Sequence, residues 1–110
     1  MSLRIHVTGT RGKSSVTEYI ASGLSAMYPG VMAKITGVIP TIIQNGSRNR
    51  IKRRGIARVQ EQVKTIFSAS RSRSGALVME CMSISPDLQQ LESRFFRPHI
   101  LVITNIRDDH

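Results

Sequence analysis

The residues best suited to chemistry lie in a glycine-containing stretch near the start of the chain. Gly9 and Gly12 let backbone amides close around phosphate oxygens, and the start of a following helix adds partial positive charge at the same place. Lys13 can reach outer phosphates, and the Ser14 hydroxyl is a suitable ligand for Mg²⁺. The strict phosphate-binding loop has a further glycine where this chain has Val7. We predict that a nucleotide phosphate is bound by Gly9, Thr10, Arg11, Gly12, Lys13, Ser14 and Ser15.

A carboxylate, Glu80, follows directly after an apolar stretch at residues 76–79. If that stretch is a strand of a parallel sheet, Glu80 emerges at the carboxyl edge, where open α/β sheets bind ligands. A carboxylate there can hold Mg²⁺ beside bound phosphates. We therefore expect Glu80 and Ser14 to lie within reach of one shared Mg²⁺ ion. The alternative role for Glu80 is a local hydrogen bond at the end of a strand.

Strands that alternate with helices are expected to position these residues. The apolar runs barely alternate with polar residues, which is typical of parallel strands covered on both faces. The predicted strands are Arg4–Thr8, Val31–Ile35, Ala76–Cys81 and Ile100–Thr104. The predicted helices are Ser14–Met27, with Val16, Tyr19, Ile20, Gly23, Leu24 and Met27 at helical spacing, and Ala57–Ser70, with Val59, Val63, Ile66 and Phe67 on one face. A third, shorter helix is expected to begin near Pro86.

The stretch between Pro40 and Gly55 breaks this alternation. Asn45-Gly46 separates two β-prone runs, which is a hairpin signal. We expect a small hairpin excursion from the sheet near residues 41–54. The whole pattern predicts an α/β fold with a doubly wound, mainly parallel sheet around a phosphate-binding loop.

A cluster of basic residues accounts for much of the formal net charge of +9. Its candidate polyanion-binding members are Arg48, Arg50, Lys52, Arg53 and Arg54. Such clusters are most often solvated surfaces and otherwise indicate nucleic acid or another polyanion. The chain has no tryptophan and few other aromatic residues, so it offers no stacking platform for single strands, and no nucleic acid is expected as a partner.

Length and cysteine content set further bounds. The 110 residues form one small domain at most, and no apolar run approaches the roughly 20 residues of a membrane helix. The single cysteine, Cys81, is expected to be a small buried strand residue, and it fits a reducing, cytoplasmic setting.

In order and spacing, four stretches resemble the Mur ligase superfamily. Its loop reads Gly-Thr-Asn-Gly-Lys-Thr-Thr, and Arg11 with Ser14-Ser15 is most similar to the poly-γ-glutamate synthase branch of capsule biosynthesis. The other matching stretches are Ala33–Gly37, Val78–Met82 and Ile103–His110. The resemblance runs from Arg4 to the last residue.

The resemblance implies an ATP-dependent, ADP-forming amide ligase that works with Mg²⁺ through an acyl phosphate. It implies that Lys13, Glu80 and His110 are catalytic and that Ser14, Thr36, Glu80 and His110 surround the metal ions. Substrates would be glutamate and growing poly-γ-glutamate, with membrane subunits of a capsule synthase complex as partners of an otherwise cytoplasmic enzyme. A ligase resembling folylpolyglutamate synthase, or another Mur-type ligase, is the alternative. A basic nucleic-acid-binding module is a second alternative, and it leaves the loop and Glu80 unexplained.

The resemblance also implies that residues 1–110 are the N-terminal portion of an ATPase domain, without the rest of that domain or a C-terminal domain. Residues 1–3 are expected to be an added sequence. We expect the 110-residue fragment alone to be inactive as a ligase. We also expect it to self-associate, because its strands are apolar on both faces while few helices are available to cover them.

Overall fold

The computed structural model describes residues 3–9, 12–28, 30–36, 40–44, 47–51, 59–81, 92, 94 and 96–104. Two helices and six strands are present in these residues. In chain order they are β1 (Leu3–Thr8), α1 (Lys13–Leu24), β2 (Val31–Ile35), β3 (Thr41–Gln44), β4 (Ser47–Arg50), α2 (Val59–Arg71), β5 (Ala76–Glu80) and β6 (Ile100–Ile103). Residues 92, 94 and 96 are also helical, whereas the predicted helix start near Pro86 lies outside the described residues.

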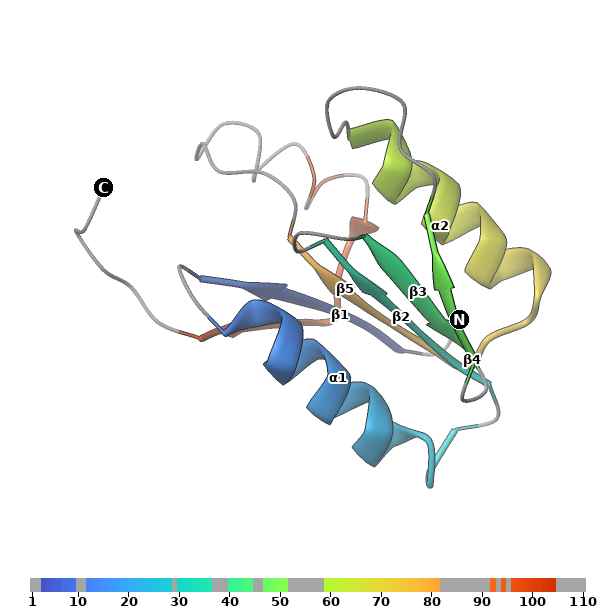
Figure 1. Ribbon diagram of the computed structural model, residues 1–110, viewed down its shortest axis with the longest axis horizontal. Coiled ribbons are helices and arrows are strands. Elements are labelled where there is room, and N and C mark those ends of the chain that lie inside the picture. Colours follow the sequence, from blue (N-terminus) through green and yellow to red (C-terminus); the bar gives the residue numbers. More distant parts are fainter. Residues whose placement is uncertain are drawn as a thin grey trace.

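The six strands form one sheet in the order β4-β3-β2-β5-β1-β6 (Figure 1). Strands β2, β5, β1 and β6 run parallel to one another, and Val7 of β1 pairs with Glu80 of β5. This arrangement confirms the predicted α/β class and the mainly parallel sheet. Since the carboxyl ends of these four strands meet at one edge, the segments after β1, β2 and β5 are brought together there.

The predicted hairpin exists, but it is not an excursion from the sheet. Strand β3 pairs antiparallel with β2, so that Thr41 lies opposite Ile35 and Gln44 lies opposite Met32. Strand β4 in turn pairs antiparallel with β3. The hairpin extends the sheet because the outer edge of β2 would otherwise present unpaired backbone amides and carbonyls. The turn residues Asn45 and Gly46, and residues 52–54 of the predicted range, lie outside the described residues.

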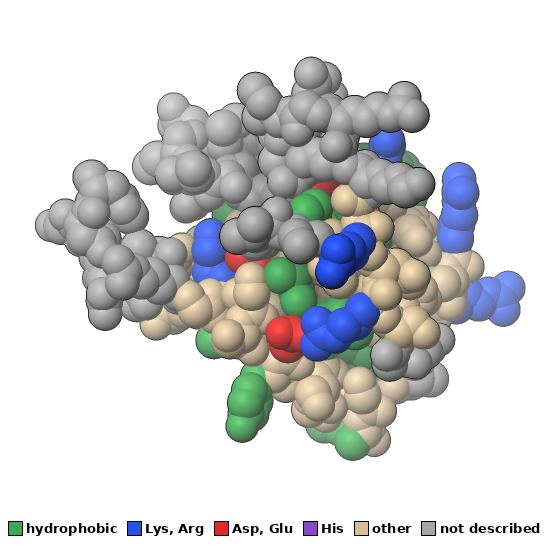
Figure 2. Space-filling view, in the orientation of Figure 1, with side chains coloured by type: hydrophobic (Ala, Val, Ile, Leu, Met, Phe, Trp, Pro, Cys, Tyr) green, Lys and Arg blue, Asp and Glu red, His purple; other side chains and the backbone are tan. Residues whose placement is uncertain are grey.

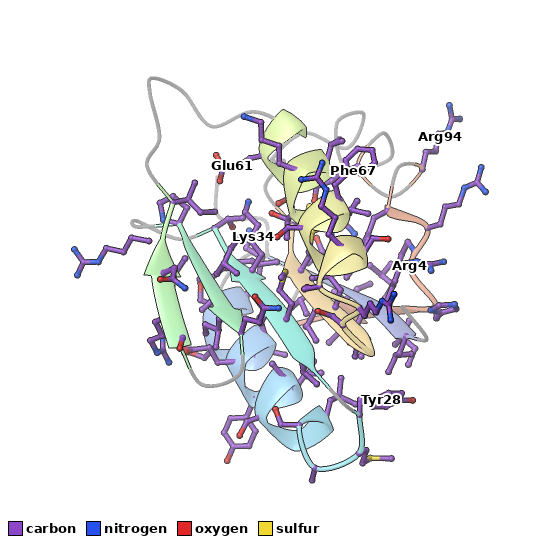
Figure 3. The ribbon with its side chains drawn as sticks, turned by 90° about the vertical axis from the view of Figure 1, so that its right-hand side faces the viewer. Arg4, Tyr28, Lys34, Glu61, Phe67 and Arg94 are labelled. Atoms are coloured by element: carbon purple, nitrogen blue, oxygen red, sulfur yellow. The ribbon has the colours of Figure 1, made fainter. Side chains whose placement is uncertain are left out.

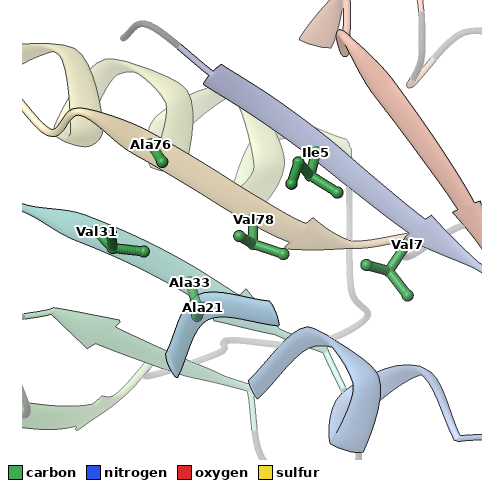
Figure 4. Close-up of a cluster of buried hydrophobic side chains, with 7 residues drawn as sticks. All are labelled: Ile5, Val7, Ala21, Val31, Ala33, Ala76 and Val78. Carbon is green, nitrogen blue, oxygen red and sulfur yellow. The ribbon is translucent and has the colours of Figure 1, made fainter. Parts of the chain in front are cut away.

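Helix α1 covers one face of the sheet and α2 the other (Figure 1). Between α1 and the sheet lies an aliphatic cluster. It consists of Ala21 of α1 and residues at alternate positions of the strands, namely Ile5, Val7, Val31, Ala33, Ala76 and Val78 (Figure 4). On the α2 side the buried cluster consists of Met32, Ala69, Leu77, Met79 and Phe96. Every residue of β5 is therefore buried, as expected for a central parallel strand.

Several large residues of the apolar helical pattern face solvent. Tyr19 and Met27 are 84% and 75% exposed, and Phe67 is 63% exposed and points away from the sheet (Figure 3). The buried positions are Thr17 and Ala21 on α1, and Gln62, Thr65 and Ala69 on α2. These mostly small side chains let each helix lie close to the sheet. Large residues beside this contact face extend into water instead.

Candidate nucleotide and metal site

The segment between β1 and α1 is a turn that depends on glycine. Gly9 and Gly12 have φ angles of 131° and 78°, a region that other residues rarely adopt. Gly12 is the N-cap of α1, and its carbonyl accepts a hydrogen bond from the Val16 amide at 3.0 Å. No side chain caps this helix, and its first turn contains no acidic residue. The amides at this helix start are thus suited to an anion.

Glu80 lies beside this helix start. Its carboxylate accepts two hydrogen bonds on the same oxygen, Oε2, from Ser14 Oγ at 2.7 Å and from the Thr36 backbone amide at 2.9 Å. Three segments of the chain, at the start of α1, the end of β2 and the end of β5, therefore meet at one carboxylate. The expected approach of Glu80 to Ser14 is present, while the role of both in metal binding stays a prediction.

The residues at this junction suit Mg²⁺ in their chemistry. A hydroxyl and a carboxylate are hard oxygen donors of the kind that Mg²⁺ prefers, and an ion with both ligands would take the place of the hydrogen bond that joins them. Glu80 is 4% exposed, so little bulk water competes for its carboxylate. The Thr36 hydroxyl, by contrast, donates to the Cys81 carbonyl at 3.4 Å.

Other predicted site residues are placed only in part. Lys13 is half-buried and Ser15 exposed in the first turn of α1. Thr10, Arg11 and His110 lie outside the described residues, as do three basic candidates, Lys52, Arg53 and Arg54.

The two remaining basic candidates, Arg48 and Arg50, are exposed on β4. Arg48 forms an ion pair with Glu18 of α1, so part of its charge is offset. It also borders an open hollow of about 780 Å³ between α1 and the hairpin, which includes Ser15, Tyr19 and Ile43. Figure 2 shows basic side chains spread over the viewed face, with acidic side chains beside some of them.

The sequence did not predict a buried polar network that lies between α2 and the sheet. Lys34, in the middle of β2, is fully buried and points toward α2 (Figure 3). Its Nζ donates to Gln62 Oε1 at 2.5 Å and lies 3.1 Å from Glu61 Oε1. The Gln62 Nε2 donates to the Glu80 carbonyl at 3.0 Å and to Glu92 Oε2 at 3.2 Å.

The network ends at a histidine. His6 Nε2 lies 2.6 Å from Glu92 Oε2, and both side chains are 1% exposed. Burial would raise the pKa of Glu92, but the hydrogen bond and charge of His6, with further hydrogen bonds from Gln62 and Cys81, lower it from 4.5 to about 2. Polar residues at inward positions of apolar strands, His6 between Ile5 and Val7 and Lys34 within β2, were the available sequence signal.

The chain's similarity to known proteins agrees with this geometry. The family model of the Mur ligase middle domain matches residues 7–110. The chain belongs to this family. Within the described residues, no helix of this Mur ligase middle domain is long and apolar enough to cross a membrane.

Two curated relatives are similar along the whole chain. One is the capsule biosynthesis protein CapB of Bacillus anthracis, 30% identical over 112 residues, which cover 98% of this chain and 24% of the relative. The other is PGA synthase CapB of Bacillus subtilis (strain 168), 28% identical over 114 residues, which cover 100% of this chain and 29% of the relative. This Mur ligase middle domain thus spans about a quarter of the length of these relatives. No solved structure shows significant similarity to it.

Proposed function

We propose that this chain is the nucleotide-binding portion of an ATP-dependent amide ligase that joins glutamate units into poly-γ-glutamate for a capsule. The observation that carries the proposal is the contact of Ser14 and the Thr36 amide with one oxygen of Glu80, beside the uncapped start of α1. The names of the two relatives, which refer to capsule biosynthesis and PGA synthesis, favour this branch over a folylpolyglutamate synthase.

The residues of this chain have distinct parts in the proposed reaction. The amides at the start of α1 and the Lys13 ammonium would hold the β- and γ-phosphates of ATP. Ser14 and Glu80 would hold Mg²⁺, which when bound neutralises charge that develops on the transferred phosphoryl group. The Thr36 amide keeps the Glu80 carboxylate turned toward Ser14. A substrate carboxylate would take the γ-phosphoryl group of ATP and release ADP. An amine would then attack the resulting acyl phosphate, lose a proton and displace phosphate to form the amide.

The proposal also assigns roles to residues and partners away from the Ser14–Glu80 contact. Thr10, Arg11 and Ser15 complete the phosphate loop, and His110 and Thr36 contribute to the metal sites. Arg48 and Arg50, with Lys52, Arg53 and Arg54, would attract the growing poly-γ-glutamate, whose every unit carries a carboxylate. We infer that residues 1–110 are the first portion of a longer ATPase domain, acting in the cytoplasm with membrane subunits of a capsule synthase.

Removal of one ammonium group tests the proposal. In the full-length protein, Lys13→Ala should abolish glutamate-dependent release of ADP, because the charge facing the outer phosphates is lost. Lys64→Ala is the matched control, since Lys64 is exposed on α2 on the opposite face of the sheet. ADP release at the wild-type rate by Lys13→Ala, with normal thermal unfolding, would remove the mechanism.

A further inference from the structure

Three potential metal ligands lie together on the α2 side of the sheet, apart from the Ser14–Glu80 junction. They are His6 in β1, Cys81 just after β5, and Glu92 in the helical segment before β6. Each is 1% exposed. The His6 imidazole nitrogen, the Cys81 sulfur and a Glu92 carboxylate oxygen all lie within 4.8 Å of one another. Residues far apart in the sequence thus direct three different ligand atoms at one buried point.

We propose that His6, Cys81 and Glu92 bind one zinc-class transition-metal ion. Thiolate sulfur, imidazole nitrogen and carboxylate oxygen are the ligands that Zn²⁺ takes in proteins. Mg²⁺ takes oxygen ligands and binds thiolates poorly, so this site differs in metal preference from the one at Ser14 and Glu80. The proposal does not depend on the ligase activity proposed above.

The charges of this set match a divalent ion. A Cys81 thiolate and a Glu92 carboxylate carry two negative charges in all, which neutralise Zn²⁺ while His6 binds as neutral imidazole. A neutral site can be buried at far smaller cost than an uncompensated charge. Upon binding, the Cys81 thiol and His6 Nε2 each lose a proton to solvent, while the imidazole keeps a proton on Nδ1. Bonds then form from Sγ, Nε2 and the carboxylate oxygen to the metal.

Only a small rearrangement is needed. Zinc bonds of roughly 2.0–2.3 Å place ligand atoms about 3–4 Å apart. The separation of 2.6 Å between His6 Nε2 and Glu92 Oε2 must therefore widen by about 1 Å. Gln62 Nε2 donates to the same Glu92 oxygen at 3.2 Å and is itself fixed by Lys34. Such outer hydrogen bonds hold ligating carboxylates in position.

The ion would join three segments that no disulfide can join, since Cys81 is the single cysteine of the sequence. Cys81 already donates its backbone amide to the Val7 carbonyl at 2.7 Å and follows Glu80 directly. An ion at this point would fix the end of β5 against β1 and the helical segment at residue 92. Its structural effect would therefore extend to the backbone that carries Glu80.

Cobalt is a direct probe of this site. The full-length protein is stripped with a chelator under reducing conditions and titrated with Co²⁺. We expect visible absorption typical of low-coordinate cobalt, a near-ultraviolet thiolate-to-cobalt band, and saturation at one ion per chain. Added Zn²⁺ should abolish both signals, while excess Mg²⁺ should leave them unchanged. Cys81→Ser should lose the thiolate band, and His99→Gln, which alters an exposed histidine, should keep it.

Two results would overturn the proposal. If the wild-type protein shows no thiolate-to-cobalt band at saturating Co²⁺, the three residues form a hydrogen-bonded cluster only. This measurement uses no variant, so misfolding of a variant cannot obscure it. If the band persists at full intensity in Cys81→Ser, the metal is bound by a different cysteine of the full-length protein.

Discussion

At the scale of single residues, Glu80 connects the fold to the proposed chemistry. Its Oε2 accepts hydrogen bonds from Ser14 and from the Thr36 amide, so the side chain is oriented before any ion binds. Glu80→Gln keeps an amide oxygen that can accept the same two bonds but removes the negative charge. We expect the fold to be retained and the Mg²⁺ concentration needed for half-maximal ADP release to rise at least about tenfold in the full-length protein.

Glu18→Gln is the control for this experiment. Glu18 also lies on α1, but its partner is the exposed Arg48, and exposed pairs contribute little to stability. Its Mg²⁺ dependence should match that of the wild type. An unchanged Mg²⁺ requirement in Glu80→Gln would show that Glu80 acts only as a structural acceptor at the end of β5.

At the scale of elements, periodicity was sufficient to predict β1, β2, β5, β6 and α1 to within a few residues, since buried parallel strands leave short apolar runs in the sequence. Spacing also predicted the approach of Ser14 to Glu80. It could not predict the network from Lys34 to His6, because His6 and Glu92 are 86 positions apart and the pairing exists only after the sheet forms. The exposure of Tyr19 and Phe67 was missed because helical spacing does not reveal how wide the contact face is.

Two glycines of α1 should respond oppositely to alanine. Gly12 has a φ of 78°, so Gly12→Ala should cost about 1–2 kcal/mol of stability through backbone strain, although no described residue beyond its chain neighbours comes within 4 Å of the new Cβ. Gly23 is a helical residue with equally open space, so Gly23→Ala should add about 0.5–1 kcal/mol. The free energy of unfolding of both variants in urea, compared with that of the wild type, measures these changes. Equal effects of both substitutions would contradict the assigned backbone conformation of Gly12.

Two phenylalanines test how the α2 face of the sheet is packed. Phe96 is 2% exposed and meets the His6 ring edge-on at a centroid distance of 5.5 Å. Phe96→Ala should therefore cost about 3–5 kcal/mol through lost burial and a cavity. Phe67→Ala should change stability by less than about 0.5 kcal/mol, because Phe67 is 63% exposed. Chemical denaturation of the two variants should separate them clearly, and similar losses would contradict the burial described here.

At the scale of the whole molecule, the two edges of the sheet differ. The hairpin strand β4 forms one edge and is polar, with Arg48 and Arg50 exposed. Strand β6 forms the other edge and exposes Ile100, Leu101 and Ile103 by 47%, 53% and 52%. Strand β5, by contrast, is buried throughout, because helices cover both faces of the sheet at its centre. Among the described strands, β6 thus combines a sheet edge with exposed apolar side chains.

We predict that the 110-residue chain self-associates through β6, and increasingly so as salt rises. An apolar edge strand recruits a neighbouring chain through its free backbone groups and its side chains. The net charge of +9 opposes this at low salt, where repulsion acts over a long range, and added salt screens it. Sedimentation velocity at low and high salt measures the effect.

A pair of variants with the same added charge separates edge pairing from general repulsion. Leu101→Lys places a charge on the β6 edge and should keep the chain monomeric at high salt. Met27→Lys adds the same charge just after α1, where Met27 is 75% exposed and is not part of β6. This variant should associate like the wild type. If both variants stay monomeric, charge alone governs association. If the wild type is monomeric at both low and high salt, the β6 edge does not mediate self-association. The short strand would then offer too little apolar area to offset the repulsion between strongly basic molecules.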